Sequence, residues 1–199
     1  MKLYDMERSG NAYRVRLMLS LLGLHAERQA VDLLAGEQHQ PWFLALNPRH
    51  QVPVLEEPDG TVIWDSMAIL VYLARQYGGE TWLPLEPRPM AEVMQWLAVM
   101  ESESQYGLAL ARAITRFGRP GDLTLAQQLG HKCLRVLETQ LTAHEWLALE
   151  RLTIADVGCF PYVALAPEGG ISLDAYPAVQ AWLSRIKILP GFIGMPGIA

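Results

Sequence analysis

The sequence predicts an α/β domain over residues 1–80 followed by an all-α domain over residues 90–199. Three observations support this division. Residues 1–80 mix short alternating segments, which are typical of strands, with amphipathic helical patterns. The patterns after that part of the chain are helical throughout. Between the two lies the segment 81–89, where three prolines within six residues break any helix and indicate a linker.

The elements expected in the first domain follow one another as strand, helix and strand, then an irregular link, then strand, strand and helix. The strand candidates are the segments 2–6, 30–33, 51–55 and 61–64. The first helix contains residues 15–22 and is expected to end at Gly23, because glycine is typical of helix C-termini. Pro58-Asp59-Gly60 predicts a hairpin turn between the last two strands. Asp65 caps the second helix, which is expected to end at Gly78-Gly79.

Four helical patterns make up the second domain. They cover residues 90–116, 123–141, 155–165 and 176–188. The third pattern is almost wholly apolar, which predicts a helix that is buried on all sides. Thr153 precedes it and Asp156 stands three residues later, so that the two side chains form a variant of the capping box. We expect this box to be structural.

Composition excludes several classes of protein. With 51% apolar and 19% charged residues, the chain is too apolar to be disordered. Its formal net charge is −5 and its arginines are scattered, which argues against nucleic acid as a partner. The two cysteines, Cys133 and Cys159, predict neither a disulfide framework nor a metal site. There is no apolar run long enough to span a membrane and no signal-peptide core at the N-terminus, so we expect a cytoplasmic protein with no membrane partner.

Chemistry is predicted at three strand ends of the first domain, and the first of these is Ser9-Gly10-Asn11. A helix N-terminus has free N–H groups and a partial positive charge that stabilise an anion, and a hydroxyl there donates to a thiolate or an oxyanion. On the residues alone, an N-cap role for Ser9 or Asn11 is the simpler interpretation. Neither a GxSxG motif nor a suitably spaced histidine supports a hydrolase.

The second place is Val52-Pro53, where a proline interrupts a strand pattern. Two alternatives remain open: a cis peptide that exposes the neighbouring backbone groups to a ligand, or a trans peptide in an edge strand. The third place is Asp65-Ser66, whose N–H groups and hydroxyl either hold a carboxylate or only cap the helix. All three lie at strand ends of one small sheet, where open sheets usually bind ligands.

Four motifs, in this order and spacing, resemble the glutathione transferase family over nearly the whole chain. Ser-Gly-Asn-Ala-Tyr-Arg-Val-Arg at residues 9–16 resembles the active-site turn of the serine-type classes, particularly zeta and theta. Asn-Pro-Arg-His-Gln-Val-Pro-Val-Leu at 47–55 is similar to the segment that carries the cis-proline of this family. Asp-Ser-Met-Ala-Ile at 65–69 and Thr-Ile-Ala-Asp at 153–156 are similar to its helix signature and its capping box.

This resemblance implies a thioredoxin-like domain that binds glutathione, a helical bundle domain that supplies the pocket of the second substrate, and a homodimer. Carried over by motif, Ser9 donates to the glutathione sulfur and Asn11 is a second donor. The residues expected to bind glutathione are Gln38 and Gln51 at the glycyl carboxylate, Val52 and Pro53 at the cysteinyl unit, and Asp65 and Ser66 at the γ-glutamyl end. The second-substrate pocket is expected to draw on Met6, Tyr106 and Arg112.

The resemblance therefore predicts an enzyme that conjugates the thiol of glutathione to a small electrophile, with glutathione as cosubstrate and without a metal. Two departures matter: His50 stands where glycine is usual, and the absence of a cysteine near the active-site turn argues against the cysteine-type classes. One alternative is a zeta-like isomerase, which is weakened because the zeta Ser-Ser-Cys turn is here Ser-Gly-Asn. Another is a non-catalytic, stress- or transcription-associated protein of the same fold. The identity of the electrophile is not encoded in these motifs.

Overall fold

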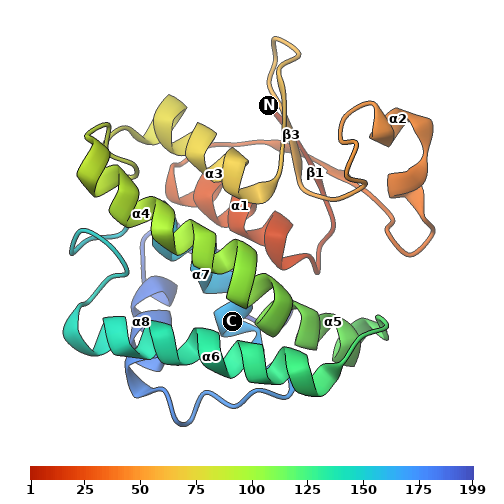
Figure 1. The fold of residues 1–199 in the computed structure, drawn as a ribbon. Helices are drawn as coiled ribbons and strands as arrows, with labels where there is room; N and C mark the ends of the chain where they lie inside the picture. Colours follow the sequence, from red (N-terminus) through yellow and green to blue (C-terminus); the bar gives the residue numbers. More distant parts are fainter.

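A four-stranded mixed sheet organises the N-terminal part of the computed structural model, which describes all residues 1–199 (Figure 1). Its strands are β1 (Lys2–Asp5), β2 (Glu27–Ala30), β3 (Val54–Glu56) and β4 (Val62–Trp64), in the spatial order β2-β1-β3-β4. β1 and β2 are parallel, whereas β3 is antiparallel to both β1 and β4. A parallel pair needs a crossover connection, which α1 (Gly10–Leu21) provides. The α/β architecture predicted for the first domain is confirmed.

Alternation along the strands divides the apolar side chains between two faces of the sheet. Leu3 and Leu55 belong to the main core, together with residues of α1 and of α3 (Ser66–Leu73). Tyr4 and Val54, one position along each strand, lie in a small cluster around Phe43 of α2 (Pro41–Leu44). The short α2 and the 3₁₀ turn η1 (Glu37–His39) occupy the link that was predicted to be irregular. Helices therefore cover both faces.

Two strand predictions need correction. The second strand is Glu27–Ala30 and not 30–33, because Asp32 accepts hydrogen bonds from the N–H groups of Leu34 and Ala35 and forms a turn there. All four residues of β2 are exposed on an edge strand, so apolar alternation does not mark it. The third strand begins at Val54, directly after Pro53, which has no N–H to donate to the ladder.

The helical domain begins with one continuous helical segment. It consists of α4 (Pro87–Val99), the π-helical stretch η3 (Met100–Ala109) and α5 (Leu110–Phe117). The segment starts three residues before the predicted Met90, since proline is well tolerated in the first turn of a helix. The remaining elements are α6 (Leu123–Ala143), α7 (Ile154–Ala164), η4 (Ala166–Gly169) and α8 (Pro177–Lys187), and α3 continues into the π-helical turn η2 (Ala74–Gly78). None of these helices is long and apolar enough to cross a membrane.

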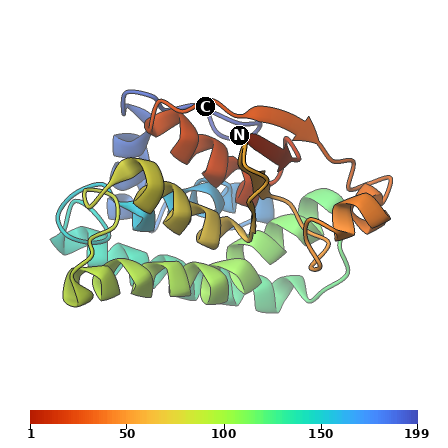
Figure 2. The same ribbon diagram turned by 90° about the horizontal axis from the view of Figure 1, so that it is seen from above.

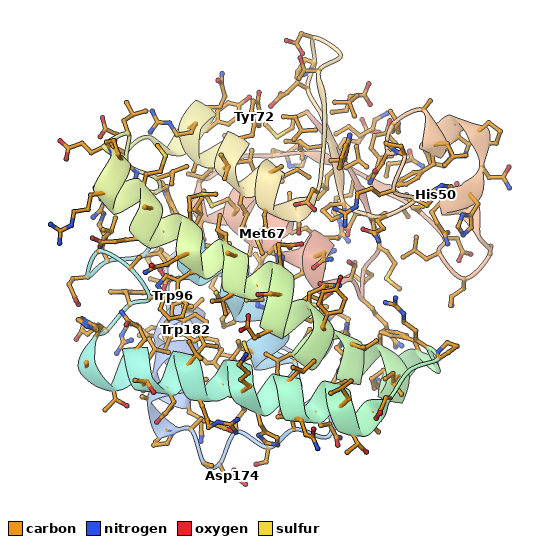
Figure 3. The ribbon with its side chains drawn as sticks, viewed as in Figure 1. His50, Met67, Tyr72, Trp96, Asp174 and Trp182 are labelled. Atoms are coloured by element: carbon orange, nitrogen blue, oxygen red, sulfur yellow. The ribbon has the colours of Figure 1, made fainter.

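α7 lies at the centre of the molecule, where it packs against α1 and α3 of the first domain and against α4 of the second (Figures 1 and 2). The predicted capping box is present: Thr153 Oγ1 accepts from the N–H of Ala155, and the Thr153 N–H donates to Asp156 at 2.9 Å. Trp182 of α8 and Trp96 of α4 are buried beside α7 (Figure 3). One hydrophobic cluster of 44 buried residues therefore runs through both domains without a break.

Candidate active site

Ser9 is the N-cap of α1, and its Oγ accepts a hydrogen bond from the Ala12 N–H at 3.2 Å. The capping role that the sequence allowed is thus real. It uses a lone pair of Oγ, while the hydroxyl hydrogen has no protein acceptor. Gly10 is required beside it, because a Cβ there would come within 2.8 Å of the Tyr162 ring. Capping and donation to a ligand are compatible at Ser9.

The turn that precedes Ser9 is fixed by two buried arginines from different domains. Arg16 of α1 donates to the carbonyl oxygen of Glu7 at 2.9 Å. Arg112 of α5 donates to the carbonyl oxygen of Arg8 at 2.9 Å. Guanidinium groups donate strong, directional hydrogen bonds, so two consecutive peptide groups are oriented directly before Ser9.

Arg112 and Met6 do not have the position expected for second-substrate residues. The Arg112 side chain is buried, forms an ion pair with Glu168 at 2.7 Å and lines neither of the two cavities described below. Met6 packs against the small cluster around Phe43 and also lines neither cavity. Tyr106 is exposed and lines the larger cavity, and its role toward a second substrate stays a prediction.

Replacing Arg112 with methionine is expected to lower turnover about tenfold, because the Arg8 carbonyl loses its donor and Ser9 is no longer held in place. Arg112→Lys keeps the charge but loses the fork geometry, and we expect an intermediate effect. Steady-state kinetics on both variants measure this. Unchanged turnover in a folded Arg112→Met variant would show that the turn does not depend on this contact.

Two adjoining cavities lie between the domains, with volumes of about 330 Å³ and about 210 Å³. They share Asn11, Gln51, Val52, Gln105 and Arg119. The larger one is also lined by Pro53, Asp65 and Ser66, and the smaller one by Ser9 and Gln38. The structure therefore brings together all the residues that the motifs assigned to glutathione. No group of three or more side chains suited to a metal ion is present.

The backbone of Val52 is free to pair with a ligand. The Val52-Pro53 peptide is cis, as the resemblance implied. Val52 is buried, yet neither its N–H nor its carbonyl oxygen makes a hydrogen bond within the protein. Since buried backbone groups are nearly always paired, these two point to a partner with an extended backbone of its own.

Two side-chain oxygens at the cavities are also buried without a partner. They are Oδ1 of Asn11 and Oε1 of Gln38. Orphaned buried polar atoms are rare in folded proteins. Both residues line the smaller cavity, which is consistent with a polar ligand that supplies the missing donors.

The start of α3 forms the polar end of the larger cavity. Asp65 caps the helix by accepting from the Met67 N–H at 2.9 Å, and its second oxygen accepts from Arg49 at 2.7 Å. Ser66 is buried, and its Oγ accepts from Nη1 of Arg14 at 3.1 Å. Because this lone pair is occupied, the Ser66 hydroxyl hydrogen is available to a ligand.

Arg14, which the motif analysis did not single out as a site residue, is a fully buried cation beneath Ser66. Its Nε and Nη2 have no hydrogen-bond partner, and Glu101 is 3.9 Å from Nη1. Burial lowers the pKa of Arg14 and raises the pKa of Glu101. In the sequence, Arg14 stands out only as a charged residue within an apolar helix pattern. Its position beneath Ser66 depends on the packing of α1 against α3 and cannot be read from the sequence.

Two residues beside the cavities have positive φ angles that side chains rarely adopt. They are His50, with φ of 57°, and Asp65, with φ of 74°. The left-handed backbone explains why glycine is usual at position 50 in the resembling motif. His50 lines the smaller cavity, and its ring nitrogen lies 2.9 Å from that of His39. Such conformations cluster at ligand sites.

Comparison with known sequences decides the family. Residues 8–76 match the profile of the glutathione S-transferase N-terminal domain, and residues 99–190 match that of the C-terminal domain. The chain belongs to the glutathione S-transferase family. Its N-terminal domain is accordingly the thioredoxin-like domain that the motifs implied, and the helical domain follows it.

Relatives within this family cover almost the full chain. Glutathione S-transferase D6 of Drosophila melanogaster is 29% identical over 96% of this chain and 90% of its own. Maleylacetoacetate isomerase of Pseudomonas aeruginosa is 30% identical over 96% and 93%. The crystal structure of a glutathione S-transferase from Pseudomonas fluorescens has a TM-score of 0.91 and 41% identity, over 98% of both chains. These relatives differ in activity and class, so the zeta- or theta-like class stays a prediction.

Proposed function

We propose that the protein is a glutathione transferase that binds glutathione as a thiolate and adds its sulfur to a small electrophile. One observation carries the proposal. Ser9, the backbone of Val52 and the Asp65-Ser66 pair surround two adjoining cavities. The hydroxyl hydrogens of Ser9 and Ser66 and the backbone groups of Val52 have no partner within the protein. In a γ-glutamyl-cysteinyl-glycine tripeptide, Ser9 and Val52 suit the thiol and the backbone of the cysteinyl unit, and Asp65-Ser66 suits the γ-glutamyl end. The cytoplasmic location and the absence of a metal requirement remain predictions.

The γ-glutamyl end of the tripeptide carries an ammonium and a carboxylate. Asp65 accepts from the ammonium, and the Ser66 hydroxyl donates to the carboxylate. Arg14 lies behind Ser66 and adds a buried positive charge close to that carboxylate. Hydrogen bonds in which the donor or the acceptor is charged are about twice as strong as those between neutral groups.

The remaining parts of the tripeptide meet the cis-proline loop and the turn before α1. The cysteinyl unit pairs its backbone with Val52, while Gln38 and Gln51 face the glycyl carboxylate. The thiol then lies near Ser9, where the hydroxyl and the helix N-terminus favour the thiolate. After the thiol proton passes to solvent, sulfur forms a bond to an electrophilic carbon, and the leaving group departs with its electron pair.

An activity panel tests this proposal. Purified protein is assayed with glutathione and an aryl halide, an organic peroxide and a maleyl compound, each against a reaction without protein. Conjugation of the aryl halide supports the transferase. Turnover of the maleyl compound alone favours the isomerase, a second candidate that the 30% identity to maleylacetoacetate isomerase supports. No turnover together with no retention on immobilised glutathione would favour a non-catalytic role.

Replacing Ser66 with alanine is expected to raise the dissociation constant of glutathione about tenfold or more, because a donor to a carboxylate is lost. Arg14 Nη1 also loses its acceptor, so Ser66→Thr, which keeps the hydroxyl, is the matched control. Calorimetric titration of folded variants measures the change. Unchanged affinity in Ser66→Ala would exclude the assigned role.

We also propose a homodimer, on the family resemblance and on four exposed apolar side chains in β4, η2, the segment before α4, and α4 itself. These side chains, Trp64, Tyr77, Leu85 and Met94, are 39%, 41%, 57% and 42% exposed. Closed two-fold pairing is the commonest way to cover such a surface. Sedimentation is expected to give about twice the 22.2 kDa of one chain. A species of single-chain mass at micromolar concentration would contradict the dimer.

A further inference from the structure

Arg119 is the one arginine at the cavities whose charge has no partner. It lies in the turn between α5 and α6 and lines both cavities. Arg49 pairs with Asp65 at 2.7 Å, and the buried Arg14 lies 3.9 Å from Glu101. Arg119 has no carboxylate within 4 Å, and its guanidinium makes no hydrogen bond. Its donors are therefore available to whatever enters the cavities.

The backbone of this turn is fixed against α5. Gly118 ends α5 in the left-handed conformation, with φ of 65°, and its N–H donates to the Ile114 carbonyl at 3.1 Å. The Arg119 N–H donates to the Ala113 carbonyl at 3.2 Å. Gly121 packs so closely on Ile114 that a Cβ would come within 2.9 Å. The turn lies at the same end of the molecule as α2 (Figures 1 and 2).

The wall of the larger cavity, to which Arg119 contributes, is largely polar. Only three of the 14 residues of the larger cavity are hydrophobic, and Gln105 lines both cavities. The charged groups that face the larger cavity are Arg49, Asp65, Glu101 and Arg119. Because Asp65 has Arg49 and Glu101 has Arg14 close by, only the charge of Arg119 is left without a neutralising group.

We propose that Arg119 binds a carboxylate of the second substrate, so that the electrophile of this enzyme is a small anionic molecule. The inference rests on the proposed function and names its substrate class. A guanidinium recognises a carboxylate through two parallel N–H donors, which fixes orientation as well as affinity. The glycyl carboxylate of glutathione is the other possible source of this group, but the proposed function assigns it to Gln38 and Gln51, which line the smaller cavity.

A matched pair of aryl halides tests the proposal. 1-Chloro-2,4-dinitrobenzene is neutral, and 4-chloro-3-nitrobenzoate carries a carboxylate in place of one nitro group while undergoing the same substitution. Steady-state kinetics with both are measured for the parent protein, Arg119→Met and Arg119→Lys. Arg88→Met is the control, since Arg88 is 93% exposed and lines neither cavity.

We expect Arg119→Met to lower kcat/KM for the benzoate about ten- to a hundred-fold, because a hydrogen bond to a charged group is lost. For the neutral halide, kcat/KM should change less than about threefold. Arg119→Lys should recover part of the loss. Equal losses for both halides would overturn the proposal. A rise in KM for glutathione without a change in preference would also overturn it, by assigning Arg119 to the glycyl carboxylate.

The same experiment tests the transferase activity separately from the substrate class. Conjugation of the neutral halide by the parent protein, with no preference that depends on Arg119, overturns the substrate class and leaves the transferase intact. If the parent conjugates neither halide and does not bind glutathione, the transferase and the substrate class both fall.

Discussion

Replacing Ser9 with alanine is expected to reduce turnover about ten- to a hundred-fold and to leave glutathione affinity nearly unchanged. A free thiol with a pKa of about 8.5 is only about 3% ionised at pH 7, so the site must favour the thiolate. A hydrogen bond to a charged group contributes roughly 1.5–3 kcal/mol, which corresponds to about one to two pKa units. The helix terminus adds about 0.3–1 kcal/mol. The hydroxyl is therefore the larger of the two contributions.

The capping role of Ser9 has to be separated from this effect. Loss of the contact to the Ala12 N–H costs about 1 kcal/mol of stability in Ser9→Ala. Ser9→Thr keeps both the hydroxyl and the cap and should retain most of the activity. Turnover and the pH at which bound glutathione ionises are measured at a temperature where all variants are folded. If the thiol titrates at the same pH in Ser9→Ala as in the parent, Ser9 is only a helix cap.

Replacing Asp156 with alanine is expected to lower the free energy of unfolding by about 3 kcal/mol or more. The carboxylate is fully buried and accepts from Trp182 Nε1 and from the N–H groups of Leu147 and Thr153, at 2.9–3.1 Å. Each buried donor that loses its partner costs about 1–3 kcal/mol. Burial raises the pKa of Asp156 to about 6, although these hydrogen bonds act in the opposite direction. Through these hydrogen bonds, the Asp156 carboxylate connects the start of α7 to α8 and to the loop that precedes α7.

Asp122→Ala is the matched control for this prediction. Asp122 caps α6 at the surface and accepts only from the Leu125 N–H at 3.0 Å, so about 1 kcal/mol should be lost. Urea denaturation of both variants gives the comparison. Equal losses would show that Asp156 is no more than an ordinary N-cap.

Much of the fold was predictable because its signals are local. The capping box at Thr153, the apolar pattern of α7 and the turn at Pro58-Asp59-Gly60 each depend on a few neighbouring residues. β2 escaped detection because an exposed edge strand needs no apolar alternation. The start of α4 was misplaced because Pro87 and Pro89 break a helix interior but fit its first turn.

The candidate site divides in the same way. The motifs identified Ser9, Val52 and Asp65 because family signatures record local geometry, and in the structure these residues line the cavities. They could not show that Arg112 faces the turn before Ser9, since this depends on how α5 packs against η4 and on the ion pair with Glu168. Arg119 gave no signal because a single arginine in a glycine- and proline-containing turn resembles any solvated loop.

The ionisation of bound glutathione in the parent protein tests the central claim most directly. Thiolate absorbance is followed as a function of pH with glutathione saturating the protein, and free glutathione serves as the reference. We predict that the bound thiol is half-ionised about one to two pH units below the free thiol. Failure to bind glutathione, or ionisation at the same pH as the free thiol, would contradict the assignment of this site as one that activates the glutathione sulfur.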